Sequence, residues 1–99
     1  MRRLAELLEA VESQTAQGGQ AVSYVGHGWL WLDPAPRRRR EKTEAGVARS
    51  VETLTATART DPRVVEGRIL RFGGGDWTVA QVGEAARPGR SDLTMERRP

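Results

Sequence analysis

The sequence contains no cysteine, a single histidine and few aromatic residues. Without cysteine, disulfide bonds and thiolate metal sites are excluded, and the chain suits a reducing cytosol. No apolar run approaches the roughly 20 residues of a membrane-spanning helix, and the basic N-terminus lacks a signal-peptide core of adequate length. We therefore expect a soluble, unexported protein without a membrane partner.

Material for a hydrophobic core is also scarce. The chain has 99 residues, and a single domain of this size hides only about 60–65% of the surface that its unfolded chain exposes. The largest side chains available are Tyr24, Trp29, Trp31, Phe72 and Trp77. Because a thin core gives marginal stability, we expect the domain to gain stability from partners or from copies of itself.

Positive charge is concentrated in one run of the sequence. The formal net charge is +3, yet residues 37–42 alone carry +4, so the other residues sum to −1. Adjacent guanidinium groups repel one another and keep a loop extended unless phosphates or carboxylates neutralise them. The run is therefore a solvated charged loop, a DNA contact or a site for an acidic protein partner. Its members are Arg37, Arg38, Arg39, Arg40 and Lys42, with Glu41 as the one acid.

The N-terminal segment fits two structures. Its apolar residues from Leu4 to Val11 have helical spacing, with good helix formers between them. Alternatively, residues 8–12 begin a β-hairpin, because Gly18-Gly19 supply a turn and residues 21–25 are able to return as a strand.

Short strands and turns account for the remaining sequence. Residues 29–32 form an apolar strand, which Asp33-Pro34 stops because proline cannot donate a ladder hydrogen bond. Nothing from there to residue 46 is apolar enough to anchor a core, so we expect a long basic loop over residues 33–46. Later strands are expected at residues 47–59, 69–72, 77–82 and 92–97, separated by Asp61-Pro62, the glycine turn Gly73–Asp76 and the loop 83–90. Residues 1–99 thus predict one mainly β domain, a small six-stranded antiparallel β-barrel with the long loop between its second and third strands.

Catalytic and metal-binding patterns are weak throughout. His27 stands between two glycines, which is typical of a turn, and with no cysteine a metal site would have to recruit scattered carboxylates. The serines lie in no nucleophile motif, and Gly73–Gly75 lacks the following Lys and Ser or Thr of a phosphate loop. We therefore expect no enzyme activity, no cofactor and no metal.

The tryptophans have two interpretations. Trp29 and Trp31 share one face of their strand, as Trp77 and Val79 do on theirs. Core packing is the default explanation for both sets. An exposed tryptophan pair would instead mark a docking surface, since tryptophan is enriched in interface hot spots.

A family resemblance covers the chain from about Leu8 to Arg97. The order of a polar alternating strand, an Asp-Pro turn, "GRILRF", a glycine-rich turn, "DWTVAQV" and a final "LTMER" resembles the head-tail joining proteins of tailed bacteriophages and gene transfer agents. The resemblance favours the hairpin over the helix at the N-terminus. It implies a stopper, or head completion protein, of the virion: a ring, hexameric in the particle, that joins the DNA-filled head to the tail.

Further expectations follow from that resemblance. The partners would be portal or adaptor proteins, the tail terminator or tail tube protein, and packaged double-stranded DNA held without sequence reading. The loop 33–46 would bring Arg37–Arg40 and Lys42 toward the DNA channel. The expected docking residues are Trp29, Trp31, Arg59, Arg63, Arg87 and Arg90. Two other functions stay open: a free-standing barrel that binds single-stranded nucleic acid, and a small protein-interaction module.

Overall fold

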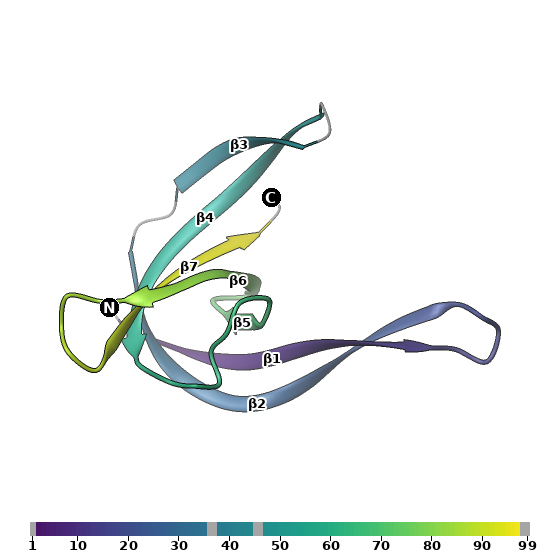
Figure 1. The fold of residues 1–99 in the computed structure, drawn as a ribbon, viewed down its shortest axis with the longest axis horizontal. Coiled ribbons are helices and arrows are strands. Elements are labelled where there is room, and N and C mark those ends of the chain that lie inside the picture. Colours follow the sequence, from purple (N-terminus) through teal and green to yellow (C-terminus); the bar gives the residue numbers. More distant parts are fainter. Residues whose placement is uncertain (1, 36–37, 45–46, 98–99) are drawn as a thin grey trace.

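A computed structural model describes the backbone of residues 2–35, 38–44 and 47–97, with side chains for residues 2–35 and 51–97. These residues form strands connected by turns, and none of them is helical (Figure 1). The strands are β1 (Arg3–Gln14), β2 (Gln20–Pro34), β3 (Arg38–Glu44), β4 (Val47–Arg59), β5 (Ile69–Phe72), β6 (Gly75–Glu84) and β7 (Arg90–Arg97).

Six of the strands close into a ring. The antiparallel order β2-β1-β5-β6-β7-β4 returns to its start because β2 also pairs with β4. That closing seam consists of three residue pairs, Leu32 with Ala58, Asp33 with Thr57 and Pro34 with Ala56. Closure satisfies the sheet edges within the ring. The predicted six-stranded antiparallel barrel is confirmed.

The N-terminal segment forms a hairpin, as the resemblance favoured. β1 pairs with β2 from Arg3 opposite Leu32 to Gln14 opposite Gln20. Gly18, with φ of 83°, makes the turn, and the Thr15 N–H donates to the Gly19 carbonyl at 2.8 Å. The helical spacing of the leucines is overridden because pairing on both sides of β1 buries Leu7 within the barrel. The distal half of this hairpin, residues 9–26, leaves the barrel as a two-stranded projection that we call the N-terminal arm (Figure 1).

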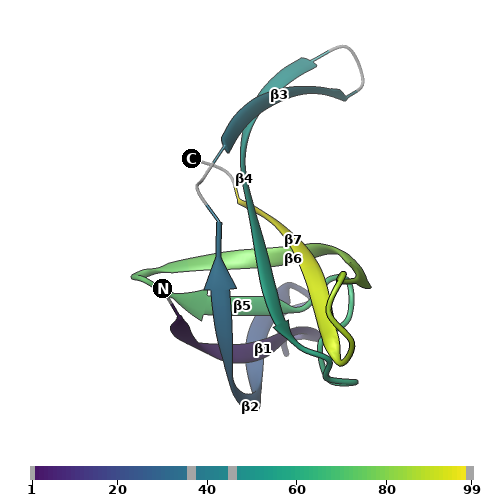
Figure 2. The same ribbon diagram turned by 90° about the vertical axis from the view of Figure 1, so that its left-hand side faces the viewer.

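A second hairpin occupies the segment that the sequence indicated as a long loop. Residues 38–44 form β3, which pairs with residues 47–53 of β4. The physical reason is that β4 extends beyond β7, its partner in the barrel, because the pairing of these two strands begins only at Glu52. The backbone N–H and C=O groups of residues 47–51 therefore need another strand as a hydrogen-bond partner. β3 and residues 47–52 form the basic arm, which extends beyond the ring in Figure 2.

The core lies inside the ring and is built from alternate residues of its strands. Trp77 is its largest side chain, 1% exposed, with the Phe72 ring stacked at a centroid distance of 6.4 Å. The Arg97 guanidinium also lies over the Trp77 ring, with its carbon 4.3 Å from the ring centroid. The core cluster is Ala5, Leu7, Leu30, Leu32, Leu54, Ala56, Ala58, Val64, Leu70, Trp77, Val79, Leu93 and Met95.

Core packing is confirmed for Trp77 and Val79 and is wrong for Trp29 and Trp31. The tryptophan pair is 56% and 55% exposed. Leu30 and Leu32 take the inward positions of β2 instead, and because strand side chains alternate, the tryptophans between them face outward.

Two glycine features position the strands. Phe72 pairs with Gly75, so Gly73 and Gly74 form the predicted hairpin turn, both with positive φ. Gly28, with φ of 101°, lies where the register of β1 and β2 shifts by one residue. His27 is therefore part of a β-bulge within β2, not of the turn that its neighbouring glycines suggested.

Candidate functional site

A cleft of about 400 Å³ opens beside the outward face of β2. We call it the aromatic cleft. Its lining residues are Arg2, Trp29, Leu30, Trp31, Asp33, Arg59, Asp61, Arg63 and Arg90. Five of the six expected docking residues therefore come together in one place, although they originate from β2, the end of β4, the following turn and β7.

The two tryptophans form the apolar part of the cleft. Trp29 and Trp31 lie two residues apart on β2, so their rings occupy the same face of the strand. The Arg2 guanidinium lies 5.6 Å from the centroid of the Trp31 ring, within the range of a cation–π contact. An exposed tryptophan pair with a cation beside it is suited to bury against a partner that has both apolar and acidic groups.

Arg63 is held firmly in its wall of the cleft. Its Nη2 donates to Asp61 Oδ2 at 2.6 Å, its Nε donates to Asp61 Oδ1 at 3.0 Å, and its Nη1 donates to the His27 carbonyl at 2.6 Å. The hydrogen bonds from Arg63 lower the pKa of Asp61 below its ordinary value of 3.8. Gly28 leaves room for this guanidinium, because a Cβ there would overlap Arg63 Nη1.

Arg90 connects the cleft to the closing seam of the barrel. Its Nη2 donates to Asp33 Oδ2 at 2.8 Å and to Thr57 Oγ1 at 3.2 Å, and these two partners face each other across the seam. Arg59 is exposed, and in the described part of the chain it has no ion-pair partner. With four arginines against two aspartates, the cleft has an excess of positive charge.

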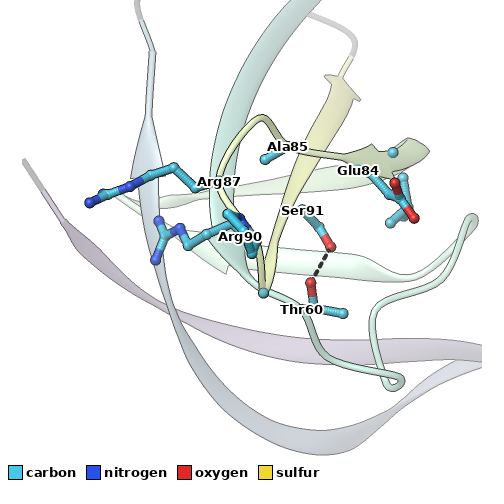
Figure 3. A pocket seen from close by; sticks show the side chains of 10 residues that line it. Thr60, Glu84, Ala85, Arg87, Arg90 and Ser91 are labelled. Carbon is cyan, nitrogen blue, oxygen red and sulfur yellow. Dashed lines mark hydrogen bonds between the residues drawn. The ribbon is translucent and has the colours of Figure 1, made fainter.

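Arg87 is the one expected docking residue outside the aromatic cleft. It lines a neighbouring hollow of about 420 Å³ formed by the loop between β6 and β7. Figure 3 shows the Arg87 and Arg90 side chains extending to the same side, away from the hydrogen bond of 3.0 Å between Thr60 Oγ1 and Ser91 Oγ.

The basic run belongs to the other projection. Arg37 lies outside the described residues. The backbone of Arg38, Arg39, Arg40 and Lys42 lies in β3, with Arg38, Arg40 and Lys42 at alternate strand positions. The contact of these residues with DNA stays a prediction.

Several contributors to these surfaces were missed by sequence reasoning. Asp33 and Asp61 were interpreted as strand-stopping and turn residues, and Arg2 was not singled out. A signal was present, since Asp61 lies two residues from Arg63, a spacing that favours a local ion pair. The exposed apolar residues of the N-terminal arm, Val11, Val22, Tyr24 and Val25, were also missed.

Groups with catalytic potential are dispersed. His27 Nε2 donates to Glu9 Oε1 at 2.9 Å, and this hydrogen bond lowers the pKa of Glu9. Within the ranges that the structure describes, there is no cluster of three or more His, Cys, Asp or Glu residues able to hold a metal ion. The same ranges contain no helix with the length and apolar character needed to cross a membrane.

Comparison with known proteins gives a structural likeness and no sequence family. No family model matches the chain, and no curated protein matches it. Among solved structures, a chain in the virion of a native gene transfer agent (GTA) particle has a similar fold, with a TM-score of 0.71 and 21% sequence identity. The similarity covers 98% of this chain and 94% of that chain. The fold is therefore shared over almost the full length of each chain.

Proposed function

We propose that this protein is a structural component of the virion of a tailed phage or gene transfer agent, and within it a ring-forming stopper of the head-tail connector. The single observation that carries the proposal is the likeness in fold to a chain of a gene transfer agent virion over 98% of the present chain. The sequence resemblance to head-tail joining proteins is an independent argument for the same function. The protein would be synthesised in the bacterial cytoplasm and act at the head-tail junction without enzyme activity or a cofactor.

In this function the barrel is the body of the ring and the arms are its contacts. The ring, hexameric by resemblance, would lie between portal or adaptor proteins on the head side and the tail terminator or tail tube on the other. The basic arm would face the channel, where Arg37–Arg40 and Lys42 contact the phosphates of packaged double-stranded DNA. Phosphate contacts carry no sequence information, which suits a protein that retains any packaged DNA.

Electron microscopy of particles produced without this gene tests the proposal. Separate heads and free tails are the expected products, and loss of DNA from the heads is expected if the ring also closes them. Normally joined, DNA-filled particles would refute the connector function.

The basic arm has its own test. Replacing the four arginines at 37–40 with serine should release packaged DNA or block tail joining, because the positive charge next to the phosphates is lost. Replacing the same four with lysine is the matched control, since lysine keeps the charge without the guanidinium geometry. Particles of the serine variant that retain DNA and tails would refute DNA contact by the arm.

A second candidate function rests on the aromatic cleft. Exposed Trp29 and Trp31 beside Arg59 are the kinds of side chain with which small barrels stack on the bases and neutralise the phosphates of single-stranded nucleic acid. This function predicts tight, salt-sensitive binding of single-stranded DNA by the isolated monomer. Titration of tryptophan fluorescence with an oligonucleotide at two salt concentrations measures it, and the stopper function predicts weak binding in the same assay.

A further inference from the structure

The N-terminal arm is a two-stranded sheet whose side chains are largely uncovered, with the Arg71 guanidinium of β5 lying 5.9 Å from the centroid of the Tyr24 ring near its base. Every residue from 10 to 26 is exposed, and four apolar side chains lie among them, Val11, Val22, Tyr24 and Val25. An isolated two-stranded hairpin is at best marginally stable in water, because neither face is covered. A long arm of this composition therefore has the properties of a segment that is buried in an assembly.

Charge identifies the kind of surface that would cover the arm. The sequence has no lysine or arginine between residues 4 and 36, and the arm carries Glu9 and Glu12. Its surface therefore combines apolar, neutral polar and acidic side chains and has no lysine or arginine. The aromatic cleft has the complementary character, with exposed Trp29 and Trp31 and more arginines than aspartates.

Geometry separates the distal part of the arm from the cleft of the same chain, although the base of the arm adjoins it through His27 and Trp29. The molecule measures 49 Å along its longest axis, and the arm extends along that axis to one end. Arg2, which lines the cleft, immediately precedes β1, and β1 begins on the side of the barrel away from the arm (Figure 1). β1 and β2 continue from the barrel into the arm as unbroken strands, so the distal part of the arm is directed away from the barrel.

We infer that the N-terminal arm of one copy docks in the aromatic cleft of a second copy. Each molecule then offers an arm at one end and a cleft at the other, which makes the contact heterologous, and repeated rotation closes such contacts into a ring. The inference rests on the proposed function, for which it supplies the contact between neighbouring subunits. The tryptophans serve as the apolar anchors, and the cleft arginines neutralise the arm carboxylates.

Complementation between two defective variants tests the contact in solution. Val22→Lys places a cation on the arm, Trp31→Ala removes an anchor from the cleft, and Val82→Lys on the exposed surface of β6 is the matched control. Analytical ultracentrifugation of the purified full chain should show that each defect weakens self-association about thirtyfold, the change expected for a hot spot, while the control associates normally. A mixture of the two defective variants retains one intact arm and one intact cleft, so it should form dimers that stop there.

The results separate the alternatives. A mixture that stays monomeric, or defective variants that associate like the native chain, would overturn the inference. A native chain that stays monomeric at all concentrations while its tryptophan fluorescence responds to single-stranded DNA would overturn it in favour of a nucleic-acid cleft.

Disulfide crosslinking tests the same contact within particles. The native chain has no cysteine, so the variant carrying Val22→Cys and Arg59→Cys holds one unique thiol pair. Oxidation should give a ladder of linked multimers on a non-reducing gel, whereas either single variant should give monomer. If deletion of the gene separates heads from tails but no ladder forms, the connector function stands and the arm contact fails. If the ladder forms but deletion leaves joined particles, the arm contact stands and the connector function fails.

Discussion

Replacing Trp77 with alanine gives the sharpest test of how this barrel is assembled. Trp77 is 1% exposed, stacks on Phe72 and is covered by Arg97. Truncation of a buried aromatic side chain costs about 3–5 kcal/mol, because the transfer free energy is lost and a cavity remains. A domain of this length has a free energy of unfolding of roughly 5–15 kcal/mol, so the variant loses a large fraction of its stability.

Trp29→Ala is the matched control for that experiment. Trp29 is 56% exposed on β2, so its truncation leaves no closed cavity and should cost about 1 kcal/mol or less. Urea unfolding of both variants, followed by far-ultraviolet circular dichroism, measures the two costs. The corresponding thermal midpoints should fall by at least about 12 °C for Trp77→Ala and by at most about 8 °C for Trp29→Ala.

The comparison decides which tryptophan faces inward. Equal costs at the two positions, or a larger cost at Trp29, would refute the assignment of Leu30 and Leu32 to the interior of the barrel. A cost below about 1 kcal/mol at Trp77 would refute its position as the centre of the core.

Three further perturbations address the barrel and the cleft. Leu32→Ala, at the closing seam, should lower the free energy of unfolding by about 2–5 kcal/mol in urea titrations, because Leu32 is fully buried. Gly28→Ala should lower the free energy of unfolding by more than about 1 kcal/mol, because φ is positive there and the new Cβ would displace the Arg63 guanidinium. Gly83→Ala is the control: Gly83 has open space around it and an ordinary φ, so this substitution should leave the urea midpoint nearly unchanged. Because its folded pKa is lowered, Asp61 contributes stability above its ordinary value of 3.8, and that contribution disappears as the pH falls through the folded pKa. Urea midpoints measured from pH 5 down to about pH 2 should therefore fall less steeply for Asp61→Asn than for the native chain, and parallel profiles would contradict the assignment.

The sequence was informative where local chemistry determines structure. Gly18-Gly19 and Gly73-Gly74 marked hairpin turns, because the positive φ of Gly18, Gly73 and Gly74 restricts those three positions to few residues. Alternation in residues 77–82 placed Trp77 and Val79 correctly in the core. The order of the strands then allowed a closed barrel to be predicted.

Other features depended on contacts that are distant in sequence. In Trp29–Leu32 both faces of the strand are apolar, so the pattern cannot tell which face is inward. β3 was missed because it pairs with the part of β4 that lies beyond the barrel, where no apolar residue is required. The ion pair of Arg90 with Asp33 spans 57 residues, and only the closure of the barrel brings its members together.

The closing seam has a mechanical consequence. β2 runs without a break from the N-terminal arm to Pro34, and β4 runs from the basic arm to Arg59. One strand of each arm therefore continues into the wall of the barrel. Within the barrel, β2 and β4 pair at only three residue pairs, one of which contains a proline without an N–H donor. Tension on the two arms is therefore carried as shear across those pairs. The hydrogen bonds from Arg90 to Asp33 and Thr57 connect the two strands there and strengthen the seam. A pull that separates the arms therefore loads this seam directly, because β2 and β4 pair with each other there.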